Sequence, residues 1–186
     1  MRIISGKFRG KKIDYPTGKI TRPLRDLVKE SIFNMIKHSN KILLDLEESV
    51  ILDLFSGSGS FGLEAISRGA KKCVFVENHL GALTALNINI KNLKCESYCS
   101  INNLDCFNYV ENLQSSKFKL DIVFLDPPYK EKKINILIND ILKKKILSKN
   151  GIIIIHRHKK DDIKLPEKLN ILDTRFYGIS KITFAN

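Results

Sequence analysis

Short apolar runs of strand type alternate with stretches of helical periodicity from residue 50 to the C-terminus. Between the runs, apolar residues recur three and four positions apart, as expected for amphipathic helices. This alternation predicts an α/β fold around a mostly parallel sheet. Two further β-rich runs at 169–177 and 179–184, joined at Gly178, predict a final hairpin. The predicted strands before this hairpin occupy residues 50–55, 73–77, 98–101, 121–126 and 151–156.

The first 41 residues depart from this pattern. Residues 2–13 are basic and strand-like, and Thr21-Arg22-Pro23 is typical of a helix start, because proline is favoured at the first helical position. Apolar residues then continue at helical spacing up to Ile36. We therefore predict a basic strand-and-helix extension at residues 1–41, packed on one larger domain at residues 42–186.

The net charge of +12 is concentrated at the two ends of the chain. Residues 1–41 hold eleven Lys and Arg against three Asp and Glu, and residues 130–186 hold fourteen against six. Residues 49–129 hold seven against eight. Basic ends around a near-neutral centre are expected if the ends bind phosphates and the centre binds a small cofactor. A genome that favours lysine codons would give the same excess, so the charge supports nucleic-acid binding without deciding it.

Several other classes of protein do not fit the sequence. No run approaches the roughly 20 apolar residues that span a bilayer, and the start lacks the apolar run of a secretory signal. We expect a cytoplasmic monomer with no membrane partner. The four cysteines, at 73, 95, 99 and 106, include no Cys-x-x-Cys pair, so we predict neither a metal site nor a disulfide framework.

A glycine-rich segment, Asp53–Gly62, lies between the first predicted strand and the following helix. Gly57, Gly59 and Gly62 match the pattern G-x-G-x-x-G, which permits a tight turn and close approach of the backbone to a ligand. Glu77 ends the next strand, 18 positions after Gly59, where a carboxylate can accept hydrogen bonds from ribose hydroxyls. The segment therefore predicts a cofactor site.

Two cofactors fit this segment, a dinucleotide and S-adenosylmethionine. A dinucleotide needs its pyrophosphate at the helix N-terminus. Asp53, at the end of the strand, would repel a pyrophosphate and would suit the cationic groups of S-adenosylmethionine, which favours the second cofactor. Asp105 opens a helix after the third strand, where its side chain would meet the adenine amino group. A plain helix N-cap is the alternative interpretation of Asp105.

The tetrapeptide Asp126-Pro127-Pro128-Tyr129 directly follows a predicted buried strand. An exocyclic amine on a base is planar and needs acceptors for its protons as it attacks a methyl carbon. The carboxylate of Asp126 and the carbonyl of Pro127 supply such acceptors, and the two prolines stiffen the loop. Tyr129 offers an aromatic face for stacking of an extracted base. Because ligands of doubly wound sheets bind at the carboxyl ends of strands, we expect this loop and the glycine-rich segment to share one pocket.

These motifs, in this order, resemble those of class I S-adenosylmethionine-dependent methyltransferases that modify exocyclic amines. More narrowly, the whole chain resembles the bacterial small-subunit (16S) ribosomal RNA guanine-N2 methyltransferases. The narrower resemblance rests on Met1–Gly10, on Thr21-Arg22-Pro23, and on Phe55–Glu64, which includes Phe55 of the cofactor motif. It also rests on Asp26, Glu30, Phe33 and Asn34.

The resemblance implies a Rossmann-like, seven-stranded sheet with an antiparallel last strand, and S-adenosylmethionine as the cofactor. It also implies small-subunit ribosomal RNA as the substrate, within an assembling 30S particle. We expect contacts with RNA from Arg2, Lys7, Arg9, Arg22 and Arg25. The chain departs from the family at Leu27, where the family has an arginine that Arg25 would replace. It also departs at His79, where the family often has an acidic residue, so we assign only Glu77 to the ribose.

Other functions fit the sequence less well. An adenine-N6 methyltransferase has the same chemistry but would need a target-recognition domain, for which 186 residues leave little room. A glutamine methyltransferase typically carries Asn in place of Asp126. A dehydrogenase would need a substrate domain, and a non-catalytic RNA-binding protein has no use for the tetrapeptide. We expect His156, Arg157 and His158, which end a strand near the pocket, to be solvated residues and not catalysts.

Overall fold

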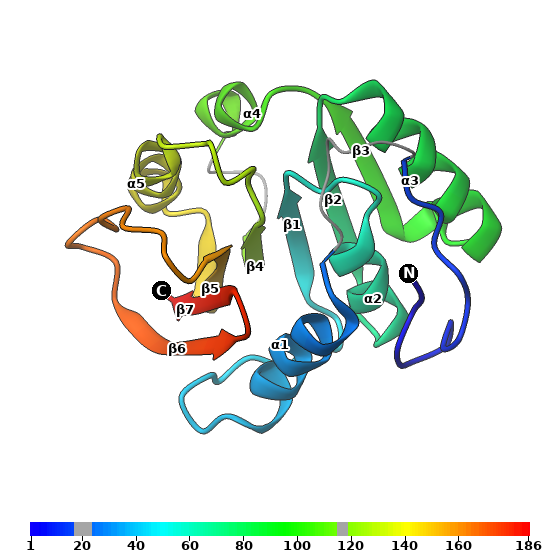
Figure 1. Cartoon of the computed structure of the whole chain (residues 1–186), viewed down its shortest axis with the longest axis horizontal. Coiled ribbons are helices and arrows are strands. Elements are labelled where there is room, and N and C mark those ends of the chain that lie inside the picture. The colour runs from blue at the N-terminus through cyan, green and yellow to red at the C-terminus, as the bar shows by residue number, and fades with distance from the viewer. Residues whose placement is uncertain (17–23, 115–118) are drawn as a thin grey trace.

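A computed structural model describes residues 1–16, 24–114 and 119–186, which fold around one seven-stranded sheet (Figure 1). The order across the sheet is β3-β2-β1-β4-β5-β7-β6. The first five strands in this order are parallel, and β7 is antiparallel to both β5 and β6. The predicted α/β fold and the final hairpin are confirmed. The strands are β1 (Val50–Leu54), β2 (Lys72–Glu77), β3 (Cys99–Asn103), β4 (Leu120–Leu125), β5 (Leu147–His158), β6 (Ile171–Tyr177) and β7 (Ser180–Ala185).

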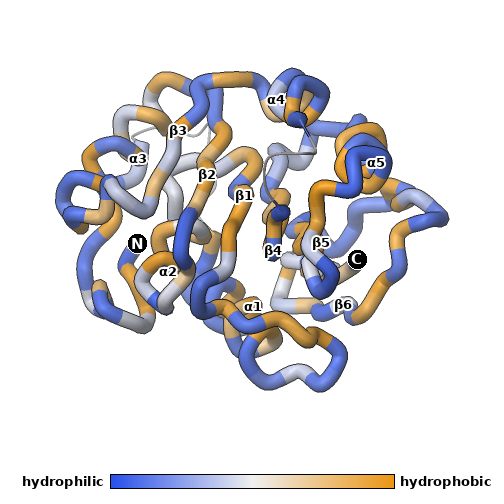
Figure 2. Tube along the Cα trace, turned by 180° about the vertical axis from the view of Figure 1, so that it is seen from behind, coloured by the Kyte–Doolittle hydropathy of each residue, from blue (hydrophilic) through white to orange (hydrophobic). Residues whose placement is uncertain are grey.

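The helices cover both faces of this sheet. The described helices are α1 (Asp26–His38), α2 (Ser60–Ser67), α3 (Leu80–Leu93), α4 (Cys106–Asn112) and α5 (Ile134–Lys144), with a short 3-10 helix at Glu96–Tyr98. One core lies between the sheet and α1, α2 and α3, and the other between the sheet and α4 and α5 (Figure 1). Successive residues of a strand point to opposite faces, so Ile51 enters the first core and Leu52 the second. The central strands are therefore hydrophobic along most of their length (Figure 2).

The N-terminal residues pack against α1 and α2. Residues 2–13 do not form the strand that we expected, because Gly6 and Gly10 have positive φ and turn the chain back on itself. One antiparallel bridge joins Arg2 to Lys12, and Ile3 and Ile13 enter the first core. The carboxylate of Glu64 accepts the backbone N–H groups of Ile4 and Ser5, at 2.7 and 2.9 Å. The predicted helix start at residues 21–23 lies outside the described residues, and α1 begins at Asp26. The boundary that we predicted at residue 41 stays a prediction.

A buried ion pair connects this segment to the helices beneath it. The ammonium of Lys29 lies 3.4 Å from the carboxylate of Glu64, and both side chains are fully buried. Burial lowers the pKa of Lys29, and the charge of Glu64 opposes this shift. Lys29 also donates to the carbonyl of Arg2 at 2.8 Å and to the hydroxyl of Ser60 at 3.2 Å. The first residues of the chain are therefore attached to the start of α2 through buried polar contacts.

The register of the parallel strands brings several loops to one edge of the sheet. Leu54 is paired with Val76 on one side and with Leu125 on the other, and Leu125 is paired with Ile155. The residues that follow these four positions therefore emerge at the same carboxyl edge. Among the residues that the structure describes, no helix is long and apolar enough to cross a membrane.

Candidate active site

A cavity of about 680 Å³ opens at this carboxyl edge. Two sequence motifs that lie far apart along the chain share it, as we expected. The glycine-rich segment and the strand after it contribute Asp53, Phe55, Gly57 and Glu77, and the second motif contributes Asp126, Pro127, Pro128 and Tyr129. The lining also includes Met1, Tyr15 and Leu24, which we had not predicted as site residues, and His156, which we had expected near the pocket but solvated.

Gly59 and Gly62 shape the glycine-rich segment without lining the cavity. Gly59 has a φ of 82°, a conformation that favours glycine, and it precedes the first residue of α2. A Cβ atom on Gly62 would lie 2.4 Å from Cys73 Sγ and from the ring of Phe75. The absence of a side chain at Gly62 therefore allows α2 to pack directly on β2. We predicted both glycines as cofactor-binding, and that role stays a prediction.

Asp53 is a buried carboxyl group at the N-terminus of α2. It is 1% exposed, and its Oδ2 atom accepts the N–H group of Gly62 at 3.0 Å. Burial raises the pKa of Asp53 well above its ordinary value of 3.8, and the Gly62 N–H group only partly opposes this shift. A cation bound next to Asp53 would favour its ionised form.

The carboxylate of Glu77 is held by main-chain N–H groups. It accepts hydrogen bonds from Gly57 at 2.8 Å, from Asn78 at 3.0 Å and from His79 at 2.9 Å. A carboxylate has about four acceptor positions, so Glu77 can still accept a hydrogen bond from a ligand hydroxyl. The backbone of the glycine-rich segment thus orients the group that we predicted to bind ribose.

Asp105 caps a helix, and it is not part of the cavity lining. Its side chain accepts the N–H groups of Phe107 at 2.9 Å and Asn108 at 3.2 Å, at the start of α4. This is the N-cap arrangement that we considered as the alternative. The expected contact between Asp105 and adenine stays a prediction.

One buried hydroxyl of the cavity is available to a ligand. Ser56 is 8% exposed, and its Oγ atom has no hydrogen-bond partner among the residues that the structure describes. A buried polar atom without a partner is unfavourable, and a ligand would remove this cost. Together with the two carboxyl groups of Asp53 and Glu77, Ser56 suits a ligand that combines positive charge with hydroxyl groups. The residues present therefore fit S-adenosylmethionine.

The Asp126–Glu131 loop is held by the end of β5. Asp126 Oδ1 lies 2.8 Å from Nδ1 of His156, and the guanidinium of Arg157 donates to main-chain carbonyls of the loop. The ring of Tyr129 meets the ring of His158 edge-on, with centroids 5.3 Å apart. Three consecutive side chains of β5 therefore contact the loop that carries the tetrapeptide.

Our expectation that these three β5 residues are solvated was wrong for two of them. His156 is 5% exposed and Arg157 is 6% exposed. The reason is that β5 continues to His158 and is covered along this part by β7, which pairs Ile182 with His156. The position of these residues near the pocket was expected, because polar residues at the end of a strand buried on both faces emerge at the edge where ligands bind.

The basic residues expected to bind RNA lie at different distances from the cavity. Arg2, Lys7, Arg9 and Arg25 are exposed, and Arg22 lies outside the described residues. Arg2 follows Met1 and Arg25 follows Leu24, and both of these neighbours line the cavity. Lys7 donates its N–H group to Ser67, at the opposite end of α2 from the cavity. Arg2 and Arg25 are therefore closer to the site than Lys7 and Arg9.

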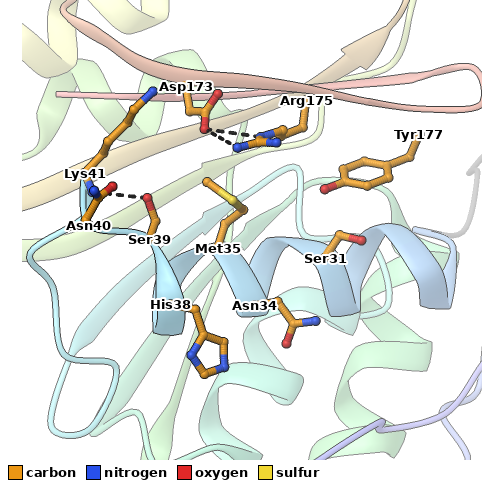
Figure 3. Close-up of a pocket in the computed structure, with 10 residues that line it drawn as sticks. All are labelled: Ser31, Asn34, Met35, His38, Ser39, Asn40, Lys41, Asp173, Arg175 and Tyr177. Carbon is orange, nitrogen blue, oxygen red and sulfur yellow. Dashed lines mark hydrogen bonds and ion pairs between the residues drawn. The ribbon is translucent and has the colours of Figure 1, made fainter.

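A second hollow, of about 750 Å³, lies between α1 and β6. Side chains of α1, such as Met35, face side chains of β6 across it (Figure 3). Its arginine, Arg175, is paired with Asp173 at 2.8 Å, which reduces its attraction for an anion. No residue of the glycine-rich segment or the tetrapeptide lines this hollow. We therefore place the candidate active site in the first cavity and not in this hollow.

Residues 1–186 match the protein family described as conserved hypothetical protein 95. Ribosomal RNA small subunit methyltransferase D of Haemophilus influenzae is 32% identical to this chain over 180 residues, which cover 96% of this chain and 90% of the relative. A Bacillus subtilis protein provisionally named rRNA methyltransferase YlbH is 34% identical over 185 residues, which cover 98% and 96%. A crystal structure of a Haemophilus influenzae protein provisionally described as a methylase has a TM-score of 0.78 at 30% identity, covering 99% of this chain and 96% of that chain.

Proposed function

This chain belongs to the family described as conserved hypothetical protein 95, and we propose that it methylates small-subunit ribosomal RNA with S-adenosylmethionine as the methyl donor. More specifically, we propose that it modifies the exocyclic N2 amine of one guanine. The observation that carries the proposal is the shared cavity, in which Asp53 and Glu77 lie with Asp126 and Tyr129. A methyltransferase family favours S-adenosylmethionine over the dinucleotide that the glycine pattern also allowed.

The residues of the cavity have different roles in the proposed methyl transfer. Asp53, Glu77 and Ser56 would hold the cofactor, which supplies an electrophilic methyl group on its sulfonium. The carboxylate of Asp126 accepts a hydrogen bond from the target amine, favours localisation of its lone pair on nitrogen, and can take the proton that the amine releases when it gains the methyl group. The carbonyl of Pro127 accepts a hydrogen bond from the second N–H group of the amine, and Tyr129 stacks against the base. Holding the amine in line with the methyl group is then the main contribution of the protein.

The choice of guanine rests on the resemblance of the N-terminal residues, because the tetrapeptide serves guanine and adenine alike. An adenine-N6 methyltransferase therefore remains the second candidate. We propose an assembling 30S particle as the substrate and a cytoplasmic, monomeric enzyme. We also keep the division into a basic extension at residues 1–41 and a catalytic domain at residues 42–186.

Mass spectrometry of small-subunit ribosomal RNA from a deletion strain tests this function. We expect one N2-methylguanine to disappear, to return with the wild-type gene, and to stay absent with the Asp126→Ala variant. Loss of an N6-methyladenine instead would favour the second candidate. An unchanged set of modified nucleotides in the deletion strain would overturn the proposal.

A further inference from the structure

Two consecutive side chains at the end of β5, His156 and Arg157, hold the Asp126–Glu131 loop at different points. We call this pair the β5 clamp. Neither residue belongs to a motif that the sequence indicated, and both are buried, at 5% and 6% exposure. The register between β4 and β5 explains why His156 meets the loop. Leu125 is paired with Ile155, and Asp126 and His156 are the next residues on the two strands.

His156 links the carboxylate of Asp126 to β7. Its Nδ1 atom lies 2.8 Å from Asp126 Oδ1, and its Nε2 atom lies 2.9 Å from the hydroxyl oxygen of Ser180. An ionised carboxylate can only accept hydrogen bonds, so Nδ1 of His156 is the donor in its contact with Asp126. This arrangement directs Oδ1 toward His156 and leaves Oδ2 for the hydrogen of a target amine.

Arg157 holds the main chain of the same loop. Its guanidinium donates to the carbonyl oxygens of Pro128 at 3.1 Å, Tyr129 at 3.2 Å and Glu131 at 3.1 Å. Its Nε atom donates to the carboxylate of Asp161, which balances the buried charge. Burial opposes ionisation of Asp161, but the hydrogen bond and charge of Arg157 prevail and lower its pKa.

Arg157 holds the carbonyl of Pro128, which is the next residue after Pro127, whose carbonyl we propose as an acceptor for the target amine. With the carbonyl of Pro128 held, and with Pro127 and Pro128 restricted in φ, the peptide group between the two prolines has little freedom. The carbonyl of Pro127 is therefore kept in one direction. A planar guanidinium with several donors can hold three carbonyl groups at once, which an ammonium does less well.

We propose that the β5 clamp positions both acceptors of the target amine, His156 through the carboxylate of Asp126 and Arg157 through the loop that carries the Pro127 carbonyl. Both act as positioning residues, His156 on a side chain and Arg157 on the main chain of the loop. The inference rests on the proposed methyl transfer and adds two residues to it. It predicts that substitutions in the clamp lower kcat and leave cofactor binding largely unchanged.

His156 is tested with one variant that removes the Nδ1 donor and one that restores it. In His156→Leu we expect kcat to fall by about 10²-fold, the typical cost of a misplaced reacting group, with the KM for S-adenosylmethionine largely unchanged. In His156→Asn the side-chain NH₂ group replaces the Nδ1 donor, and we expect it to recover much of the loss. His38→Leu, an exposed position on α1, is the matched control. Equal activity of the Leu variant and the wild type would overturn the role of His156.

Arg157 is tested with Arg157→Lys, which keeps the charge and loses the planar set of donors. We expect kcat to fall by about tenfold, because a misplaced acceptor no longer meets the amine. Arg175→Lys makes the same chemical change in an exposed ion pair on β6 and is expected to retain wild-type activity. Wild-type kcat in Arg157→Lys would overturn the role of Arg157.

Hydrogen exchange separates a failure of the clamp from a failure of the proposed function. The N–H group of Glu131 donates to the carbonyl of Pro128, one of the three oxygens that Arg157 holds. We expect peptides covering residues 127–133 to exchange at least about tenfold faster in Arg157→Lys than in the wild type, as in a locally opened segment. If the wild type does not methylate ribosomal RNA, the proposed function fails. Unchanged exchange in Arg157→Lys would overturn the clamp whatever the activity.

Discussion

The cofactor half and the target half of the cavity are held by different parts of the chain. In the cofactor half, the carboxyl groups of Asp53 and Glu77 accept main-chain N–H groups of the glycine-rich segment and of the residues after β2. In the target half, Asp126 and its loop are held by two side chains of β5. Main-chain donors are present whatever the side chains, whereas the target half depends on two particular residues. The two halves should therefore respond differently to substitution.

The strongest test of this separation is Asp126→Ala. We expect methyl transfer to fall by about 10³-fold or more, because the target amine loses its carboxylate acceptor. The affinity for S-adenosylmethionine should be retained, since the cofactor half is held independently. Transfer of labelled methyl groups to small-subunit ribosomal RNA measures the first effect, and calorimetry measures the second. Full activity of the variant would contradict the proposed role of Asp126 as an acceptor for the target amine.

Glu77→Ala is the complementary change in the cofactor half. We expect S-adenosylmethionine to bind more weakly by about 1.5–3 kcal/mol, the contribution of a hydrogen bond to a charged group. Activity at saturating cofactor should fall far less than in Asp126→Ala. Calorimetric titration measures the change, and Glu96→Ala, at an exposed site, is the control. An unchanged affinity would reject the assignment of Glu77.

Asp53→Asn is expected to raise stability while it weakens cofactor binding. An unfolded Asp releases its proton near pH 3.8, and the raised pKa of folded Asp53 keeps the proton bound to higher pH. The folded state therefore binds more protons in that window, and the free energy of unfolding falls as the pH rises above about 4.

The Asn variant lacks this loss, so it should be the more stable protein at pH 7. Its affinity for S-adenosylmethionine should fall by about tenfold, because a charge-assisted contact with the cation is lost. Urea unfolding at pH 4 and pH 7, with calorimetry at pH 7, measures both effects. A parallel pH dependence of stability in the two proteins would contradict the assigned pKa shift.

The smallest effect is expected from single basic residues outside the cavity. RNA affinity should fall steeply with salt, because bound phosphates release counterions. Arg25→Gln should lower the slope of log K against log salt by about one, and Arg9→Gln should have a weaker effect because Arg9 lies near the far end of α2. Filter binding across a salt series measures both slopes. An RNA affinity that does not change with salt concentration would contradict the proposal that the basic ends of the chain bind RNA phosphates.

Much of the fold could be predicted from local patterns. The apolar runs at residues 50–54 and 121–125 are strands because they are buried on both faces, and Gly178 joins the final hairpin. The glycine-rich segment and the tetrapeptide each follow a strand of the same parallel sheet, so their meeting at one edge was predictable as well. The role of Asp105 could not be predicted from the sequence, because a carboxylate that precedes a helix can cap the helix as readily as it can contact a ligand.

By itself, the sequence determined the order of strands and helices along the chain and the residues that can perform the proposed chemistry. Those properties depend on spacing along the chain, which is visible in one dimension. Only the tertiary structure decided how Asp126 is held, because His156 lies 30 residues further along the chain and Ser180 another 24. Contacts of that kind depend on the register between β4 and β5 and on the insertion of β7 beside β5. The polar residues at the end of β5 look like solvated residues until their neighbouring strands are in place.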